Sequence, residues 1–332
     1  MKRSFYTTAN GPTWSVSRDQ QLQSCERKYF FQYVAEAKIN SPDPWLRGIA
    51  LLKKLKNIPM WQGECVHLVI AEYLNQVRQR HSPTALESLV QSLRQRMQRE
   101  WQFSEKRRFR EEPAAVGKTG VALFEHEYDE MPPETSVEAL IEKAAKMTGT
   151  FYAWAEGESG LAEKVRTAER IWIEPPAWGV EAPGFMTNNV QVITKVDLAL
   201  HHRGVSFTVY DWKTGKPPRQ TTEPSQNELQ VSVYMLWANL GLKLPLDGVT
   251  SRLVYLGGDQ GKELCFDLDE ERAVETYRII EDSVRLAQQW ESYFAKRRLK
   301  LGDLDYAASV EECRRCNFKR VCRANLTPEN EL

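Results

Sequence analysis

The feature that most constrains this chain is an apolar, β-branched run that ends in an acid and an amine. Residues 205–210 read Val-Ser-Phe-Thr-Val-Tyr, and Asp211, Trp212 and Lys213 follow, before a Gly-Lys-Pro-Pro turn. Such a run favours an extended strand. Side chains two residues apart on a strand share a face, so Asp211 and Lys213 project together. An acid held beside an amine at a strand's end can bind a divalent cation and orient a water molecule.

A second carboxylate is predicted to face the same site. Residues 192–197 read as another strand, which ends in Asp197, and a turn at residues 201–204 would pair the two strands as a hairpin. Gly204 can take the positive φ that such a turn needs. The two antiparallel strands would then present Asp197, Asp211 and Lys213 to one pocket.

Size and composition indicate an ordinary globular protein. The 332 residues are 42% hydrophobic and 27% charged, enough to bury a core in one elaborated domain or two. No apolar run approaches the roughly 20 residues that a membrane span needs. The first six residues lack the apolar segment of a signal peptide. We therefore expect a cytoplasmic protein without a membrane partner.

The charge is balanced overall but unevenly placed. A net charge of zero excludes a uniformly basic nucleic-acid binder. Residues 91–110 nevertheless hold seven Lys or Arg against two acids, and residues 296–323 hold nine against four. Residues 111–142 hold nine acids against one Lys. Basic segments can follow a phosphate backbone, although a charge run is more often a solvated helix face.

The predicted elements alternate between helices and strands. A helix is expected over about residues 17–34, with Cys25 on its apolar face, and another over about 63–80, with His67 beside its buried stripe. From residue 63 to residue 258 the predicted order is helix, three strands, helix, strand. The strands are expected at 170–174, 192–197, 205–210 and 251–256, and the second helix at 226–240.

The acids and the histidine suit a divalent metal ion. Mg²⁺ and Mn²⁺ prefer carboxylate oxygen, and a single imidazole fits Mn²⁺ well. Asp197, Asp211 and His67 would form a partial shell, completed by water and backbone carbonyl oxygen. Lys213 would lie beside the ion, hold or help deprotonate a water, and neutralise charge growing on a phosphate. The alternative is that Asp211 and Lys213 are solvated strand-end groups and His67 a hydrogen-bonded core residue.

The order of these motifs resembles the RecB-type branch of the PD-(D/E)XK nuclease superfamily. The resemblance is carried by Gly63-x3-His67, Asp197, Asp211-x-Lys213-Thr214-Gly215 and Gln230-x3-Tyr234. It implies an α/β, restriction-endonuclease-like core with metal ligation by His67, Asp197 and Asp211. It also implies a catalytic Lys213, with Gln230 and Tyr234 organising the site or the DNA. The acid of the family's first long strand is either Glu169 or Glu174.

The cysteines form an independent pattern. Cys313, Cys316 and Cys322 are closely spaced near the end of the chain, and Cys25 lies near its beginning. Three thiolates cannot complete a four-coordinate site, so a fourth must come from elsewhere. Four thiolates suit tetrahedral zinc or an iron–sulfur cluster, and spacing does not decide between them. The other two cysteines, Cys65 and Cys265, read as small core residues.

This arrangement resembles the iron–sulfur subset of RecB-like nucleases, among them AddB and the CRISPR-adaptation nucleases. The resemblance implies a [4Fe-4S] cluster on Cys25, Cys313, Cys316 and Cys322, which ties the two chain ends together around the core. Zinc is the alternative. The expected domains are an N-terminal helical segment (1–60), a nuclease core (61–258) with a helical insertion at about 82–165, and a C-terminal helix with a cysteine-rich tail (259–332).

The function implied by the family is a metal-dependent DNA nuclease, expected to be an exonuclease on single-stranded DNA or DNA ends. The process would be DNA repair, recombination, or CRISPR or phage-related processing. Aromatic residues near basic ones can stack on unpaired bases, although most should be core. They are Trp14, Tyr29, Phe30, Phe31, Trp61, Trp101 and Phe103.

The alternative function is a catalytically weak nuclease-fold subunit that binds DNA or acts as a scaffold beside a helicase or integrase. Gly117-Lys118-Thr119 lacks the glycine that a phosphate-binding P-loop needs five positions earlier. No ATP-driven motor is therefore visible in the sequence, which makes such a partner plausible.

Overall fold

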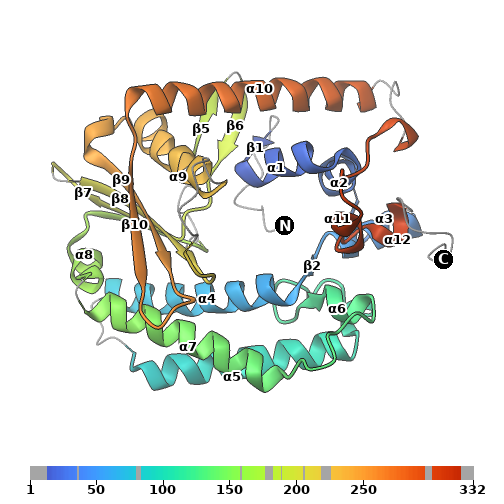
Figure 1. The fold of residues 1–332 in the computed structure, drawn as a ribbon, viewed down its shortest axis with the longest axis horizontal. Helices are drawn as coiled ribbons and strands as arrows, with labels where there is room; N and C mark the ends of the chain where they lie inside the picture. The colour runs from blue at the N-terminus through green and yellow to red at the C-terminus, as the bar shows by residue number, and fades with distance from the viewer. Residues whose placement is uncertain are drawn as a thin grey trace. The chain divides into compact units, whose positions relative to one another are not determined.

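The chain forms two compact units, each built from segments that are separated in the sequence. A computed structural model describes residues 13–35, 37–79, 84–157, 159–175, 182–187, 189–204, 206–217, 226–295 and 301–322 (Figure 1). Unit 1 comprises residues 1–15, 62–97 and 136–281, and unit 2 comprises residues 16–61, 98–135 and 282–332. The three domains expected from the sequence were continuous segments, with boundaries set by the motifs. That division stays a prediction. Within the described ranges, no helix has the length and apolar character needed to cross a membrane.

Unit 1 is organised around a five-stranded mixed sheet with the order β10-β9-β8-β7-β4. Its strands are β4 (Arg170–Ile173), β7 (Leu198–His202), β8 (Ser206–Lys213), β9 (Val249–Tyr255) and β10 (Lys262–Asp267). β4, β7 and β8 form an antiparallel meander, whereas β8 and β9 are parallel. A parallel pair needs a crossover, and α9 (Gln226–Leu236) lies within it. The main sheet thus has three strands, a helix and a strand in the predicted order, with β7 in place of the strand expected at 192–197.

The prediction was wrong about the middle strand. β6 (Val190–Ile193) ends before Asp197 and belongs to a separate three-stranded sheet with β1 (Thr13–Trp14) and β5 (Gly184–Thr187). The chain leaves that sheet at Thr194, whose N–H donates to the carbonyl of Pro183. Asp197 precedes β7, so it begins a strand of the main sheet. The hairpin itself is formed by β7 and β8, and Gly204 has the expected positive φ of 71°.

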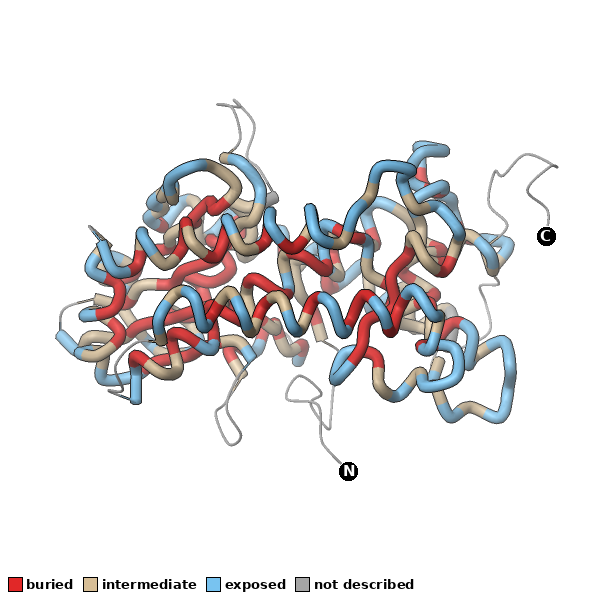
Figure 2. The backbone as a smooth tube through the Cα atoms, turned by 90° about the horizontal axis from the view of Figure 1, so that it is seen from below, coloured by how far each residue is buried: buried red, intermediate tan, exposed pale blue. Residues whose placement is uncertain are grey.

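The alternation of β8 separates its aromatic side chains from its acid. Tyr210 and Trp212 share a face, where both rings contact Trp154 of α7 (Val137–Glu156) at centroid distances of 6.2 and 5.8 Å. On α9, Val231 packs with Leu253 and other apolar residues of β9 and β10. In Figure 2 the central strands are largely buried, while the helices alternate between buried and exposed residues. Helices thus cover the sheet from which Asp211 projects.

The helix that carries His67 is α4 (Ile58–Arg78), which begins five residues before the expected start at Gly63. The carboxylate of Glu125 caps it, since Oε1 accepts a hydrogen bond from the Ile58 N–H at 3.0 Å. A side chain 67 residues later in the chain therefore fixes this end, which local sequence does not reveal. The predicted apolar stripe of α4 is buried, with at most 2% exposure at Val66, Val69, Ile70, Tyr73 and Leu74.

Unit 2 is largely helical and packs the beginning of the chain against its end. Its short elements are α1 (Val16–Ser24), α2 (Glu26–Tyr29), α3 (Pro44–Leu52), α6 (Phe124–Glu127), α11 (Val310–Arg314) and α12 (Lys319–Cys322), with β2 (Leu55–Lys56) and β3 (Ala122–Leu123). α5 (Leu86–Glu105) and α10 (Glu270–Ala295) cross the unit boundaries. Phe31 stacks on Phe318 with ring centroids 5.2 Å apart, inside a core that also buries Phe109.

One local prediction fails in unit 2 and one in unit 1. The helix expected over 17–34 is interrupted at Cys25, which is extended (φ −165°) and accepts the Lys28 N–H at 3.4 Å. The aromatic residues that lie near basic ones are mostly core, as expected from the sequence. Six of the seven are at most 8% exposed, and the seventh, Phe30, is half-buried. Cys265 is exposed, because β10 is an edge strand, whereas Cys65 is buried as expected.

Candidate active site

The two aspartates meet because β7 begins where β8 ends. Leu198 pairs with Tyr210, so the preceding residue, Asp197, lies opposite Asp211. Asp197 Oδ2 accepts a hydrogen bond from the Trp212 N–H at 2.8 Å. β8 therefore holds the Asp197 carboxylate through a backbone N–H and supplies the second carboxylate, that of Asp211, from a side chain. This register replaces the predicted arrangement in which both strands ended in an acid.

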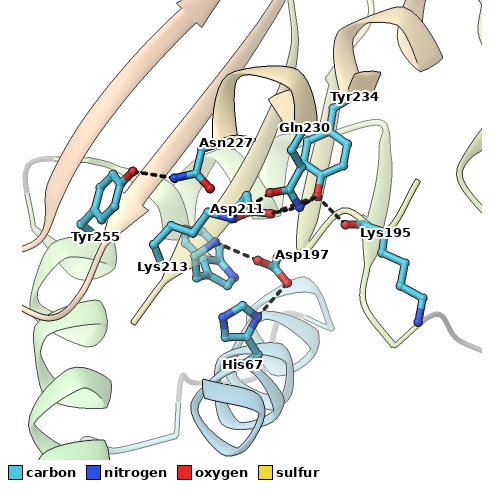
Figure 3. Close-up of polar contacts among 10 residues, drawn as sticks. His67, Lys195, Asp197, Asp211, Lys213, Asn227, Gln230, Tyr234 and Tyr255 are labelled. Atoms are coloured by element: carbon cyan, nitrogen blue, oxygen red, sulfur yellow. Dashed lines mark hydrogen bonds and ion pairs between the residues drawn. The ribbon is translucent and has the colours of Figure 1, made fainter. Parts of the chain in front are cut away.

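His67 reaches the same site from α4. Its Nδ1 lies 2.9 Å from Asp197 Oδ1 (Figure 3). Burial lowers the pKa of His67, but the charge and hydrogen bond of Asp197 outweigh this effect, and the pKa is raised overall. One turn earlier, a Cβ on Gly63 would lie 3.3 Å from Thr214 Oγ1. A glycine therefore lets α4 approach the segment that follows Lys213, which gives the Gly63-x3-His67 spacing a physical reason.

The remaining side chains surround Asp211 (Figure 3). Lys213 Nζ lies 2.7 Å from Asp211 Oδ2 and donates a hydrogen bond to Gln230 Oε1 at 2.8 Å. The amide of Gln230 donates in turn to Asp211 Oδ1 at 3.2 Å. The Tyr234 hydroxyl accepts from that amide and lies 3.0 Å from Asp211 Oδ1 and 2.7 Å from the carbonyl of Lys195. Gln230 and Tyr234, one turn apart on α9, thus orient the acid and the amine together.

The electrostatics of the site favour a bound cation. Burial and the negative charge of Asp197 raise the pKa of Asp211, and the ammonium of Lys213 opposes this only in part. Burial and Asp211 also raise the pKa of Tyr234. Asp211 is 4% exposed, and its Oδ2 is contacted by the Lys213 ammonium at 2.7 Å. A divalent cation would add positive charge beside Asp197 and Asp211 and relieve the repulsion between the two carboxylates.

The donor set of two carboxylates and one imidazole suits Mg²⁺ or Mn²⁺. As they are placed, no three His, Cys, Asp or Glu side chains among the described residues form a metal-ion site. Metal ligation by His67, Asp197 and Asp211 therefore stays a prediction, supported by the contact of His67 with Asp197 and by the charge repulsion between Asp197 and Asp211.

The structure separates the two candidate acids of the first strand. Glu169 lies at the hairpin end of the sheet, where its N–H donates to His201 and its carboxylate pairs with Arg203 at 3.9 Å. The N–H of Glu174 donates to the carbonyl of Asp197 at 3.2 Å. By backbone position, Glu174 is the acid nearer to the site.

Sequence reasoning missed one contributor to the site. Gly257 follows β9, and its N–H donates to the carbonyl of Gly215 at 3.1 Å. A Cβ on Gly257 would lie 2.6 Å from that backbone, so this close approach requires glycine. The Gly-Gly pair after residue 256 marks the end of a strand in the sequence, but nothing there reveals the neighbour.

Comparison with known proteins identifies the family. A family model described as the PD-(D/E)XK nuclease superfamily matches residues 13–323. The chain belongs to the PD-(D/E)XK nuclease superfamily. A search of curated proteins finds no match. Among solved structures, the chain is similar to an exonuclease candidate from Eubacterium rectale (10% identity, 97% of this chain and 93% of that chain covered, TM-score 0.46). It is also similar to SSO0001 (16% identity, 61% and 80% covered, TM-score 0.28). Both TM-scores lie below 0.5, so neither likeness bears on function.

In this PD-(D/E)XK superfamily member, the four predicted cluster cysteines lie around one cavity of unit 2. The cavity has a volume of about 310 Å³, and Cys25, Cys313, Cys316 and Cys322 all line it. Burial raises the pKa of the last three thiols, that of Cys322 to about 11 even though Arg27 opposes the rise. The structure thus brings together cysteines from both ends of the chain.

Proposed function

We propose that this protein is a metal-dependent DNA nuclease of the RecB-like kind, which acts as an exonuclease on single-stranded DNA or DNA ends. The observation that carries the proposal is the joined arrangement of Asp211, Lys213 and Gln230 beside Asp197 and His67. Family membership supports a nuclease. The processes that the resemblance implies, DNA repair, recombination, and CRISPR or phage-related processing, are part of the proposal.

A divalent cation would be held by Asp211, Asp197 and His67, and would supply Lewis-acid stabilisation of charge on a phosphate. The chain's own residues prepare the site for it. Gln230 fixes the orientation of Asp211 through Oδ1, and the ammonium of Lys213 contacts Oδ2. The backbone N–H of Trp212 and the imidazole of His67 fix Asp197 in the same way.

Lys213 supplies the second positive charge. Its ammonium contacts both Asp211 Oδ2 and Gln230 Oε1, so its position is set before a substrate arrives. A fixed cation stabilises negative charge that develops on a phosphate without reorganisation during the reaction. The ammonium has a third N–H, which can hold a water molecule by a hydrogen bond.

The proposal is tested by cleavage of end-labelled single- and double-stranded DNA with Mg²⁺ or Mn²⁺. We expect cleavage to require the metal and to fall by at least about 10²–10³-fold in Asp211→Ala and Lys213→Ala. The matched control is Asp259→Ala, since Asp259 is an exposed acid of the same unit (side chain 91% exposed) that pairs with Lys146. A folded Asp211→Ala protein that cuts at the wild-type rate would overturn the site.

We further propose that Cys25, Cys313, Cys316 and Cys322 hold a [4Fe-4S] cluster. The supporting observation is that all four cysteines line one recess of unit 2, of about 310 Å³. Four thiolates can hold a [4Fe-4S] cluster or a single zinc ion, so the bound metal distinguishes the two. Metal analysis of protein purified without oxygen should give about four iron atoms per chain and a brown colour. One zinc per chain in colourless protein would favour the zinc alternative.

A scaffold role beside a helicase or integrase is the competing function. It predicts wild-type protein that binds DNA tightly and cuts none of the substrates with either metal. The same cleavage assay therefore distinguishes the two functions.

A further inference from the structure

Unit 2 contains a second recess, of about 240 Å³, that neither the carboxylate site nor the cysteine cavity uses. Arg99, Gln102 and Phe103 lie on one face at the end of α5, and Lys106, the first residue after the helix, continues their spacing. The lining consists of Arg99, Gln102, Phe103, Lys106, Arg108, Glu112 and Thr119. Three of these side chains are cations and one is an acid.

The floor of the recess is a fixed aromatic ring. Phe103 is 7% exposed, and a Cβ on Gly120 would lie 2.5 Å from its ring, so glycine lets the backbone lie against that ring. After α5 the chain turns at Arg107, which has a left-handed φ of 51°. This turn brings the guanidinium of Arg108 over Phe103 at 5.3 Å from the ring centroid. The recess is therefore shaped by buried and backbone contacts.

The charge of the recess is not balanced internally. Arg108 is paired with Glu112 at 2.6 Å. Arg99 and Lys106 are exposed, and their side chains make no hydrogen bond or ion pair with another residue that the structure describes. Two cations that line the same recess repel each other, and an anion between them removes that repulsion. The amide of Gln102 and the hydroxyl of Thr119 add neutral hydrogen-bond donors.

We propose that this recess binds a backbone phosphate of the DNA substrate, at a point outside the cleavage site. The inference rests on the proposed nuclease function. Arg and Lys are the side chains that bind phosphate most strongly, and such contacts position a strand without reading its sequence. Arg99 and Lys106 supply the charge, and Arg108 holds the ring beneath them. The basic stretch of residues 91–110 thereby gains a role that its sequence left open.

The test measures how binding depends on salt. A labelled single-stranded oligonucleotide is titrated by fluorescence anisotropy in EDTA, with wild-type protein and with Arg99→Gln/Lys106→Gln. Because each neutralised phosphate contributes about 0.7 to the slope of log Kobs against log salt for single strands, and the recess binds one phosphate, the double variant should lower the slope by about 0.7. By the same relation, binding at 0.15 M salt should weaken roughly fourfold. Each single variant should show a smaller change in slope than the double variant.

The matched control removes the same charge elsewhere in unit 2. Lys38 is exposed and Arg285 forms an exposed pair with Asp282, and neither lines the recess. Lys38→Gln/Arg285→Gln should keep the wild-type slope. A recess variant with the wild-type slope, or a control variant with an equal loss, would overturn the proposal.

A competition arm separates a strand phosphate from a free nucleotide. AMP, added to the wild-type complex in millimolar excess, should not displace the oligonucleotide. If AMP binds and the recess variant loses only AMP binding, the recess is a mononucleotide site and the proposal is wrong. Wild-type protein that neither binds nor cuts DNA would instead overturn the proposed function, so the two failures differ.

Discussion

The carboxylate site of unit 1 and the cysteine cavity of unit 2 are held together in different ways. In the first, the functional side chains bond to one another: His67 to Asp197, and Gln230 to both Asp211 and Lys213. In the second, Cys25 and Cys316 each accept a backbone N–H at 3.4 Å, and all four thiols line a recess of about 310 Å³. The first arrangement is organised by its own polar contacts, whereas the segments of the second are joined by neighbouring residues, such as Arg27, whose Nε donates to the carbonyl of Leu304 at 3.0 Å. We infer that a group bound to the cysteines contributes to folding, while the carboxylate site contributes to chemistry.

The largest expected effect is therefore on the cysteine cavity. Cys316→Ser should destabilise the protein by more than about 4 kcal/mol and leave it without bound iron, because a structural metal group contributes its binding free energy to folding. Chemical denaturation and iron analysis measure both effects. Cys265→Ser is the control, since Cys265 is exposed on β10 of unit 1. If the two variants are equally stable, a group bound to the cysteines does not contribute to folding, and the proposed difference between the two sites is wrong.

A smaller effect is expected when the network around Asp211 is opened without removing the acid. Gln230→Ala should lower the cleavage rate by about 10–100-fold, as for residues that orient metal ligands, while the fold is retained. Asn227→Ala is the matched variant on the same helix, because Asn227 bonds to the hydroxyl of Tyr255 at 3.3 Å and not to Asp211. If both variants lose the same activity, the loss comes from α9 as a whole and not from the network.

The buried acid should also have a measurable cost for stability. Since the pKa of Asp211 is raised in the folded protein, the ionised form is disfavoured there, and stability is lost as the pH rises through that pKa. In EDTA, Asp211→Asn should therefore be more stable than wild type by about 1 kcal/mol at pH 8. The difference should shrink toward pH 4, where the unfolded-state carboxyl also becomes protonated. Urea unfolding of both proteins at pH 8 and pH 4 measures this difference in stability. If wild type is the more stable protein at pH 8, ionised Asp211 does not destabilise the fold.

Much of the carboxylate site could be read from the sequence, because its determinants are local. The alternation of β8 put Asp211 and Lys213 on one face, and Gly204 marked the turn. The sequence did not reveal that β6 and β7 are different strands. Residues 190–202 carry an almost continuous run of strand-forming residues, and the break before Asp197 depends on contacts with other segments, including Pro183.

The cysteine cavity shows the opposite balance. The spacing of Cys313, Cys316 and Cys322 predicted that a fourth thiol must join them, and the structure places Cys25 at the same cavity. The local structure was predicted less well. An apolar spacing that continues past Cys25 indicated one helix, but the thiol caps a new helix at that residue. The sequence identifies the cysteines as candidate metal ligands by their residue type and spacing. The backbone conformation around them depends on tertiary contacts, which the local sequence does not show.

The smallest effect concerns the approach of α4 to the segment after Lys213. In Gly63→Ala the new Cβ lies 3.3 Å from Thr214 Oγ1, so one of the two must move by a few tenths of an ångström. Helix propensity favours alanine by about 1 kcal/mol, which should offset the strain and leave the stability nearly unchanged. Cleavage should fall less than tenfold, because the displacement reaches Lys213 through one neighbouring residue. Thr214→Ala removes the contact, so a double-mutant cycle on the cleavage rate should give a coupling of about 0.5–1 kcal/mol. A coupling of zero would mean that Gly63 and Thr214 affect cleavage independently. The close approach of α4 to Thr214 would then not contribute to the position of Lys213 and its polar network.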